Sequence, residues 1–153
     1  MSYFYFDNKK VFFDERGEGY PLLLLHGNVS SSSIFKSDLA FFFQYFKVIV
    51  MDYPGHGKSD RLESFRDDFW LYNAKAAIEL CRHLGIDEIN IIGTSGGALT
   101  ALNISVLEPN LPKLIIADSF LGNRLSVTEA GRIAENRQKS KSNFLASQYW
   151  KTH

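Results

Sequence analysis

A serine set among glycines is the residue in this sequence best placed for covalent chemistry. Residues 93–97 read Gly-Thr-Ser-Gly-Gly and centre Ser95 in a G-x-S-x-G pattern. An apolar run ends directly before this segment and a helix-prone run starts directly after it, so the sequence predicts a sharp strand-to-helix turn. Such a turn strains the backbone of Ser95 and turns its hydroxyl outward, while Gly93 and Gly97 leave room where strand and helix meet. We therefore predict that Ser95 is a nucleophile for a carbonyl carbon.

Residues 26–29, His-Gly-Asn-Val, follow an earlier apolar run and can serve the same reaction. We expect the backbone N–H groups of Asn28 and Gly96 to form an oxyanion hole, with Gly96 at the positive end of the helix dipole. One such donor is typically worth about 3–4 kcal/mol of the barrier. His26 and Gly27 are interpreted as loop structure, because a catalytic histidine is expected after the serine in the chain.

A third glycine-rich segment, residues 52–59, ends another apolar run and reads Asp-Tyr-Pro-Gly-His-Gly-Lys-Ser. Its glycines and proline predict a tight turn. His56 and Ser59 are interpreted as groups that fix this loop, since neither stands at a metal-ligand spacing, and we expect no metal site. The glycines around Ser95 match neither a phosphate-binding Walker loop nor the G-x-G-x-x-G of dinucleotide-binding proteins.

Alternating strands and helices must position these segments. Four short runs rich in Leu, Ile and Val have the pattern of parallel strands buried on both faces, and helix-prone stretches separate the last three. The predicted fold class is therefore α/β, a mostly parallel twisted sheet with helices on both faces. The expected strands are residues 21–25, 47–52, 88–92 and 113–117, after an antiparallel hairpin of 3–6 and 10–14, and the expected helices are 65–84 and 95–107.

Local signals give further expectations for the first helix and for single residues. Ser64 and Asp67 have the spacing of a capping box at the start of that helix, and Gly85 is its stop signal. Cys81 lies on the apolar face of the helix, so it is interpreted as a buried structural thiol. The three phenylalanines of residues 41–43 are interpreted as core.

Composition limits the classes of partner. The chain has 153 residues, of which 45% are hydrophobic and 22% charged, enough for one modest domain with a core. Seventeen basic residues balance seventeen acidic ones without a basic patch, so nucleic acid and membrane are not expected partners. No stretch has the length of a membrane span or the pattern of a signal peptide. With one cysteine, and thus no internal disulfide, the expected location is the cytoplasm.

The three glycine-rich segments, in this order, resemble the α/β-hydrolase superfamily. The resemblance covers about residues 10–120 and is closest to the lid-bearing branch of esterases, lactonases, thioesterases and carbon–carbon bond hydrolases. It implies the α/β-hydrolase fold, a Ser–His–Asp triad, a small-molecule substrate, no cofactor, and a cap inserted after the sixth strand. Residues 1–120 are accordingly interpreted as the N-terminal part of the core and residues 121–153 as the start of the lid helices.

The part that the family carries after its cap is missing from this sequence. The resemblance implies two more strands there, with the catalytic acid and histidine, so the fold is expected to lack its last strands. After Ser95 the chain offers Asp118, a minor candidate for the acid that better suits a hinge or lid contact, and the terminal His153. We expect the histidine and acid that activate Ser95 outside this chain. The strand over 113–117 would then be an apolar edge, which predicts a second chain or a swapped copy along it.

Three functions stay open at this point. The first is a serine hydrolase that acts on a small ester, thioester or lactone through an acyl-enzyme, with the activity of the short chain itself undecided because the base is missing. The second is a carbon–carbon bond hydrolase or lyase on the same scaffold. The third is a ligand-binding relative whose serine is vestigial. Phe120, Tyr149 and Trp150 are interpreted either as the lining of an apolar pocket or as lid packing.

Overall fold

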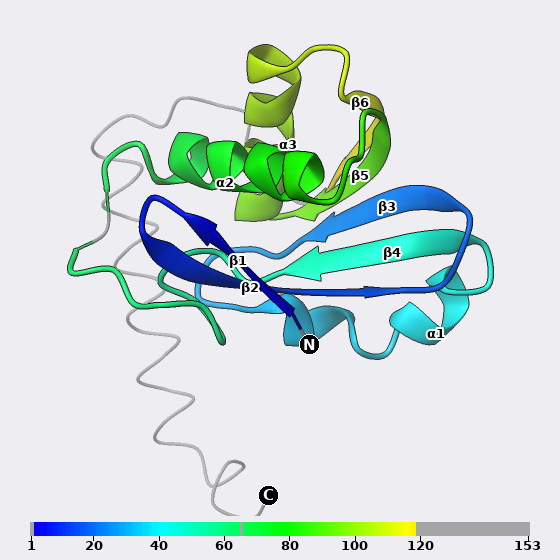
Figure 1. Ribbon diagram of the computed structural model, residues 1–153, viewed down its shortest axis with the longest axis horizontal. Coiled ribbons are helices and arrows are strands. Elements are labelled where there is room, and N and C mark those ends of the chain that lie inside the picture. Colours follow the sequence, from blue (N-terminus) through cyan, green and yellow to red (C-terminus); the bar gives the residue numbers. More distant parts are fainter. Residues whose placement is uncertain (1, 65, 119–153) are drawn as a thin grey trace, which may run out of the picture. The chain divides into compact units, whose positions relative to one another are not determined.

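A mixed β-sheet organises residues 2–64 and 66–118, which are the residues that the structure, a computed structural model, describes (Figure 1). Its strand order is β1-β2-β4-β3-β5-β6. Residues 121–153, expected to start a lid, lie outside the described residues. The strands are β1 (Ser2–Phe6), β2 (Lys9–Arg16), β3 (Tyr20–Leu25), β4 (Phe46–Met51), β5 (Ile89–Thr94) and β6 (Pro112–Asp118), and the helices are the 3-10 helix η1 (Ser32–Phe35), α1 (Leu39–Phe42), α2 (Phe69–His83) and α3 (Gly96–Leu107).

The sheet is parallel where the candidate residues lie. β1, β2 and β4 pair antiparallel, whereas β4, β3, β5 and β6 run parallel to one another. The predicted α/β class with a mostly parallel sheet is confirmed, and so is the antiparallel hairpin at the start. Because parallel strands end at the same edge of a sheet, the loops that follow β3, β4 and β5 meet there. These loops are residues 26–29, residues 52–59 and the turn at Ser95.

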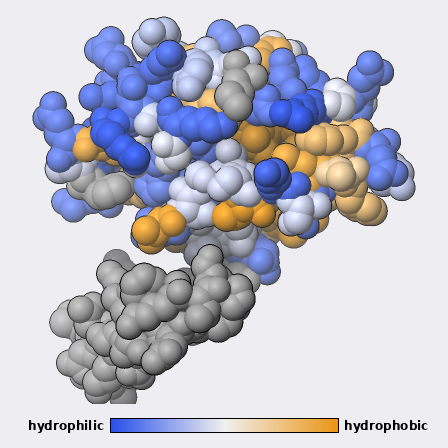
Figure 2. All heavy atoms as spheres, turned by 90° about the horizontal axis from the view of Figure 1, so that it is seen from below, coloured by the Kyte–Doolittle hydropathy of each residue, from blue (hydrophilic) through white to orange (hydrophobic). Residues whose placement is uncertain are grey.

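Each face of the sheet has its own apolar core. On one face, α2 and α3 pack over strand residues such as Leu23, Ile49 and Ile91. On the other face, Leu24 packs with Phe35 of η1 and with residues of α1. Helices therefore lie on both faces, as predicted, but the second cover is short, because η1 and α1 have four residues each. Figure 2 looks at that face, where hydrophobic side chains gather between hydrophilic ones.

Helix α2 starts later than its sequence pattern predicts. The helix begins at Phe69, and its N-cap residue Asp68 makes no side-chain capping hydrogen bond. The Asp68 carboxylate instead binds the Arg66 guanidinium, with 2.7 Å between Oδ1 and Nε. The predicted capping box of Ser64 and Asp67 is therefore wrong. Phe69 is buried, and its packing on the core decides where the helix starts, since tertiary contacts override local signals.

Two single side chains test the expectations about the core. Cys81 is buried, and burial raises the pKa of its thiol to about 12, so it is a structural thiol as predicted. Phe41, by contrast, is 61% exposed. The core interpretation of residues 41–43 is wrong for Phe41, because α1 is a single turn that lines a groove. No helix in the part of the chain that the structure describes is long and apolar enough to cross a membrane.

Candidate active site

Ser95 occupies a strained position between β5 and α3. Its backbone has φ 54° and ψ −120°, a region that costs a residue other than glycine on the order of 1–3 kcal/mol. The side chain is exposed, and within the described residues its hydroxyl makes no hydrogen bond. The backbone N–H of Ser95 donates to the carbonyl oxygen of Asp118 at 2.8 Å, which ties the turn to the end of β6. The sharp strand-to-helix turn predicted at Ser95 is present.

Two glycines let the strand and the helix approach each other. A β-carbon on Gly97 would lie 2.8 Å from the carbonyl oxygen of His26 and nearer still to that of Leu25. A β-carbon on Gly93 would collide in the same way with the carbonyl group of Gly97. All of these neighbours are backbone atoms, which cannot swing aside as the tip of a side chain can. The turn therefore requires glycine at both positions, as the sequence pattern predicts.

Trp70 of α2 packs against the elbow. Its indole ring rests on Gly96, where a β-carbon would overlap the ring. The indole is held in turn by Phe69 and Tyr53, whose ring centroids lie 4.9 Å and 6.5 Å from it. This contact limits the movement of the backbone that carries the Gly96 amide. Sequence reasoning missed Trp70, because a contact between separate segments leaves no local signal.

The loop after β3 lies directly beside Ser95. A β-carbon on Gly27 would be 2.9 Å from the Ser95 β-carbon and 3.4 Å from its hydroxyl oxygen. The next residue, Asn28, is exposed, and its side-chain oxygen accepts the N–H of Val29 at 3.0 Å. The backbone N–H groups of Asn28 and Gly96 donate to no acceptor in the described residues. Two available donors close to an exposed hydroxyl are what an oxyanion hole needs.

His26 holds this loop through both nitrogens of its ring. Its Nδ1–H donates to the carbonyl oxygen of Gly27 at 2.8 Å, and its Nε2 accepts the N–H of Tyr53 at 3.2 Å. The ring is buried, and burial lowers the pKa of His26 to about 4. With both nitrogens engaged and the neutral form favoured, His26 is not available to take a proton from Ser95.

Asp52 fixes the loop after β4. Its carboxylate accepts the backbone N–H of Ser32 at 2.6 Å and of Lys58 at 2.8 Å, and its carbonyl oxygen accepts the Ser59 hydroxyl at 2.6 Å. His56 of the same loop is buried, and burial lowers the pKa of its imidazole. In the described ranges, no three His, Cys, Asp or Glu side chains come together as metal ligands. The hydrogen-bond network that the sequence predicts for this loop therefore centres on Asp52. Sequence reasoning assigned no role to Asp52, although aspartate side chains often accept backbone N–H groups at turns.

Asp118 ends β6 beside the elbow. Its carboxylate accepts the hydroxyl of Thr94 at 3.4 Å, and the two residues lie opposite each other in the sheet. A triad needs a histidine between the acid and Ser95. No described histidine is hydrogen-bonded to either side chain. The described histidines are His26 and His56 in the loops and His83 on α2, and His153 lies outside the described residues.

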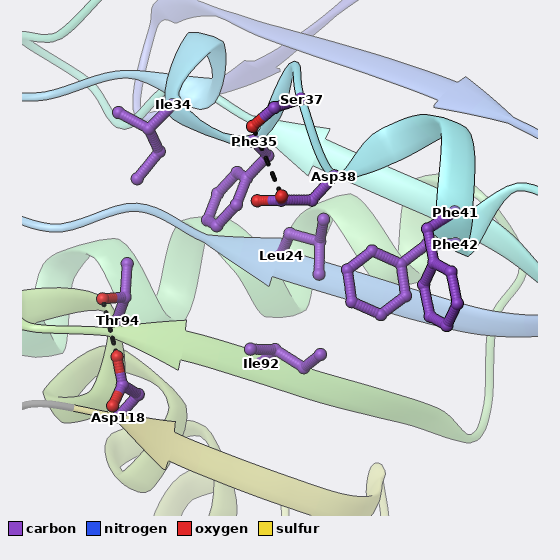
Figure 3. Close-up of a pocket in the computed structure, with 10 residues that line it drawn as sticks. All are labelled: Leu24, Ile34, Phe35, Ser37, Asp38, Phe41, Phe42, Ile92, Thr94 and Asp118. Carbon is purple, nitrogen blue, oxygen red and sulfur yellow. Dashed lines mark hydrogen bonds between the residues drawn. The ribbon is translucent and has the colours of Figure 1, made fainter.

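Two grooves open next to these residues. The first, of about 520 Å³, has Leu24 and Ile92 as its floor and Thr94 and Asp118 at one end (Figure 3). The second, of about 570 Å³, contains Asn28 of the loop after β3. Either volume suits a small organic substrate. Phe35, Phe41 and Phe42 are among the other residues of the first groove, and Val29, His56, Arg66, Asp67, Phe69 and Trp70 complete the second.

Comparison with known proteins identifies the family. A family model described as the alpha/beta hydrolase fold matches residues 20–149. The chain therefore belongs to the α/β-hydrolase family. The resemblance of its three glycine-rich segments to that superfamily is confirmed.

Relatives of known activity are longer than this chain. It is 33% identical over 111 residues to (E)-2-((N-methylformamido)methylene)succinate hydrolase of Acinetobacter baylyi, covering 70% of this chain and 40% of that protein. It is 32% identical to 2-hydroxy-6-oxo-6-phenylhexa-2,4-dienoate hydrolase of Comamonas testosteroni, over 69% of this chain and 38% of that protein. A thermophilic esterase from Thermogutta terrifontis superposes with a TM-score of 0.73 at 25% identity, over 78% of this chain and 44% of the esterase. The chain thus spans less than half the length of these three proteins.

Ser95→Gly is expected to stabilise the chain. Glycine adopts φ 54° and ψ −120° without strain, which removes a cost on the order of 1–3 kcal/mol, while its freedom in the unfolded chain costs about 0.5–1 kcal/mol. We expect a net gain of about 1 kcal/mol in the free energy of unfolding, measured by urea denaturation. Ser95→Ala keeps the strain and should change stability by less than about 0.5 kcal/mol. Equal stability of the glycine and alanine variants would contradict stored strain at this position.

Proposed function

We propose that Ser95 is the nucleophile of a serine hydrolase that acts on a small ester, thioester or lactone. The observation that carries the proposal is the exposed Ser95 hydroxyl on a strained turn, with Gly27 against it and the N–H groups of Asn28 and Gly96 unused by any described acceptor. Strain of this kind persists only where the surrounding structure enforces it, and it concentrates at functional sites. The hydrolases among the relatives support the same chemistry.

In the proposed reaction the Ser95 oxygen attacks the carbonyl carbon and its proton passes to a base. The carbonyl oxygen gains negative charge, which the N–H groups of Asn28 and Gly96 stabilise. The tetrahedral intermediate collapses to acyl-Ser95, and the leaving group departs with the proton from the base. Water, deprotonated by the same base, then attacks the acyl group, releases the acid and restores the hydroxyl.

The base and its acid partner are proposed to lie outside the described residues. A serine without a base retains only oxyanion-hole and binding effects, which are orders of magnitude weaker than the full triad. The Acinetobacter relative has more than half of its length beyond the match, where such groups can reside. Asp118 stays a minor candidate for the acid, since its carboxylate is next to Thr94 at the same sheet edge. The cytoplasm stays the proposed location, because Cys81 has no second cysteine to pair with.

A carbon–carbon bond hydrolase is the second candidate, and the names of the relatives favour it. The Comamonas relative is named for 2-hydroxy-6-oxo-6-phenylhexa-2,4-dienoate. That compound contains no ester, thioester or lactone, so its hydrolysis must break a carbon–carbon bond. The same oxyanion hole would stabilise charge on a ketone oxygen. The aromatic wall of the second groove, formed by Phe69 and Trp70, suits an aryl or diene substrate.

Covalent labelling tests the nucleophile directly. A fluorophosphonate probe should label Ser95 in the full-length protein that carries the proposed base, because the probe phosphonylates activated serine hydroxyls, and Ser95→Ala should lose the label completely. Mass spectrometry of the digested protein locates the modified peptide. Ser2→Ala, which removes an exposed serine of β1 at the opposite edge of the described sheet, is the matched control and should keep the label. Labelling that survives Ser95→Ala would contradict the assignment of the nucleophile.

Ser95→Cys separates the geometry of the site from its activation. A thiol at an exposed helix N-terminus has a lowered pKa, so we expect iodoacetamide to modify it several-fold faster than an unperturbed thiol. Cys81 should stay unmodified, because burial raises the pKa of its thiol to about 12. Fast alkylation of the variant, without fluorophosphonate labelling of the wild type in the full-length protein that carries the proposed base, would favour the ligand-binding alternative. Slow alkylation in a folded variant would contradict the proposed site itself.

A further inference from the structure

Val29, the residue after the proposed oxyanion donor Asn28, has a backbone conformation that valine ordinarily avoids. Its φ is 54°, in the left-handed region, where the β-carbon of an L-residue crowds its own backbone and a β-branched side chain is least tolerated. Residues 28 and 29 form a turn, and a turn position with positive φ is normally occupied by glycine or asparagine. Turn geometry therefore does not explain a valine at this position.

The other described residues with positive φ each have an explanation. Besides glycines, these residues are Asp7, Asn8 and Ser95. Asp7 and Asn8 form the two-residue turn between β1 and β2, where their residue types are favoured. Ser95 is the proposed nucleophile. Val29 has neither explanation, yet it lies in the loop beside the nucleophile, and backbone strain of this kind concentrates at functional sites.

The side chain of Val29 faces the second groove and is almost uncovered. Val29 is 92% exposed, so packing within the chain does not compensate for its unfavourable backbone. It lines the groove of about 570 Å³ together with Asn28 and the aromatic side chains of Phe69 and Trp70. The groove thus places a strained apolar side chain next to an available N–H donor and opposite an aromatic wall.

We propose that Val29 determines substrate specificity by contacting the apolar acyl substituent of the substrate in the second groove. The proposal rests on the function proposed for Ser95. Consecutive α-carbons are about 3.8 Å apart, so a carbonyl oxygen bound by the Asn28 N–H brings the groups on its carbon within reach of Val29. The leaving group takes its proton from the base, which is proposed to lie outside the described residues. It therefore faces away from the groove, and the acyl substituent fills it.

The composition of the groove favours an uncharged alkyl or aryl substituent. Phe69 and Trp70 offer apolar and aromatic surface on the side of α2. Arg66 and Asp67 line the same groove with opposite charges, so the pair provides no net charge that would select an ionised substituent. A further segment of the protein that filled this groove would cover the Asn28 N–H, which the oxyanion requires.

The ratio of two ester activities tests this contact in the full-length protein that carries the proposed base. The two esters, p-nitrophenyl butyrate and p-nitrophenyl acetate, differ by two methylene groups in the acyl part. Val29→Phe narrows the groove and should lower the butyrate-to-acetate ratio of kcat/KM about tenfold or more. Ile34→Phe adds the same ring at an exposed residue of the first groove and should leave the ratio unchanged. An unchanged ratio in Val29→Phe, or a change in Ile34→Phe alone, would overturn the proposal.

Failure of this assignment differs from failure of the proposed function. Fluorophosphonate labelling of Ser95 with an unchanged ester ratio in Val29→Phe overturns only the role of Val29. Absence of both labelling and ester turnover overturns the proposed function and, with it, this assignment.

The stability of Val29→Gly shows whether Val29 is instead a packing residue. In the same full-length protein, Val29→Gly should unfold at an equal or higher urea concentration than the wild type. Glycine adopts φ 54° without strain, and the exposed side chain takes no buried surface with it. A lower urea midpoint would mean that Val29 packs against another part of the protein, which would overturn the proposal.

Discussion

Gly97→Ala is expected to cost about 3 kcal/mol or more of the free energy of unfolding. The added β-carbon would lie 2.8 Å from the carbonyl oxygen of His26 and closer still to that of Leu25. Both oxygens belong to the backbone at the end of β3, a strand held on two sides by β4 and β5, so α3 would have to move off the sheet. Small domains have about 5–15 kcal/mol of stability in all. We therefore expect a large fall in the urea midpoint followed by circular dichroism.

Because Gly97 lies in a helix, the direction of the stability change in Gly97→Ala shows whether the added β-carbon collides with β3. Alanine is favoured over glycine inside a helix by about 1 kcal/mol, so the variant would gain stability if no collision occurred. Val106→Ala is the matched control, since Val106 lies in the same helix with 80% of its surface exposed. It should change stability by less than about 0.5 kcal/mol. A Gly97→Ala chain as stable as the wild type would mean that α3 does not approach β3 this closely.

Features that lie on contiguous residues could be predicted from the sequence. Ser95 and its flanking glycines form one segment, and the apolar run before it and the helix-prone run after it decide its conformation. The loops at residues 26–29 and 52–59 were reached by the same reasoning, because parallel strands that end at one edge bring their loops together. For the turn at Ser95 and these two loops, the local sequence pattern is enough to predict their position in the fold.

Contacts between distant segments could not be predicted in this way. Trp70 packs on Gly96, and Asp52 accepts the N–H of Ser32, although nothing in their spacing connects these residues. The start of α2 depends on a similar contact, since the buried Phe69 is its first residue. A capping signal competes with such packing, and the packing contributes more energy than one cap.

Strand β6 shows a different limit of sequence patterns. Its Leu and Ile residues were taken to indicate burial on both faces, but Leu114 and Ile116 are exposed and β6 ends the described sheet. An apolar run indicates a surface that is stable when covered, and it carries no information on which polypeptide covers it. For this reason the sequence pattern of β6 does not say what covers its exposed side chains.

Acidification is expected to destabilise the fold through His26. Burial lowers the pKa of His26 to about 4 in the folded chain, below its ordinary value of 6.5. Between these values the unfolded chain binds a proton that the folded chain does not, so the stabilising contribution is complete above about pH 6.5 and is lost as the pH falls toward about 4. The difference corresponds to about 3 kcal/mol, of which about 2 kcal/mol should be lost by about pH 5.

The test compares the free energy of urea unfolding at neutral pH and near pH 5 in the wild type and in His26→Gln. The variant loses the ring that accepts the Tyr53 N–H and starts from a lower stability, but its stability should fall by about 2 kcal/mol less on acidification. His56, whose pKa is also lowered by burial, is present in both proteins, so its share cancels. If the wild type and His26→Gln lost stability in parallel, His26 would not be the neutral ring that holds the loop, and the N–H of Asn28 would need another anchor to serve as an oxyanion donor.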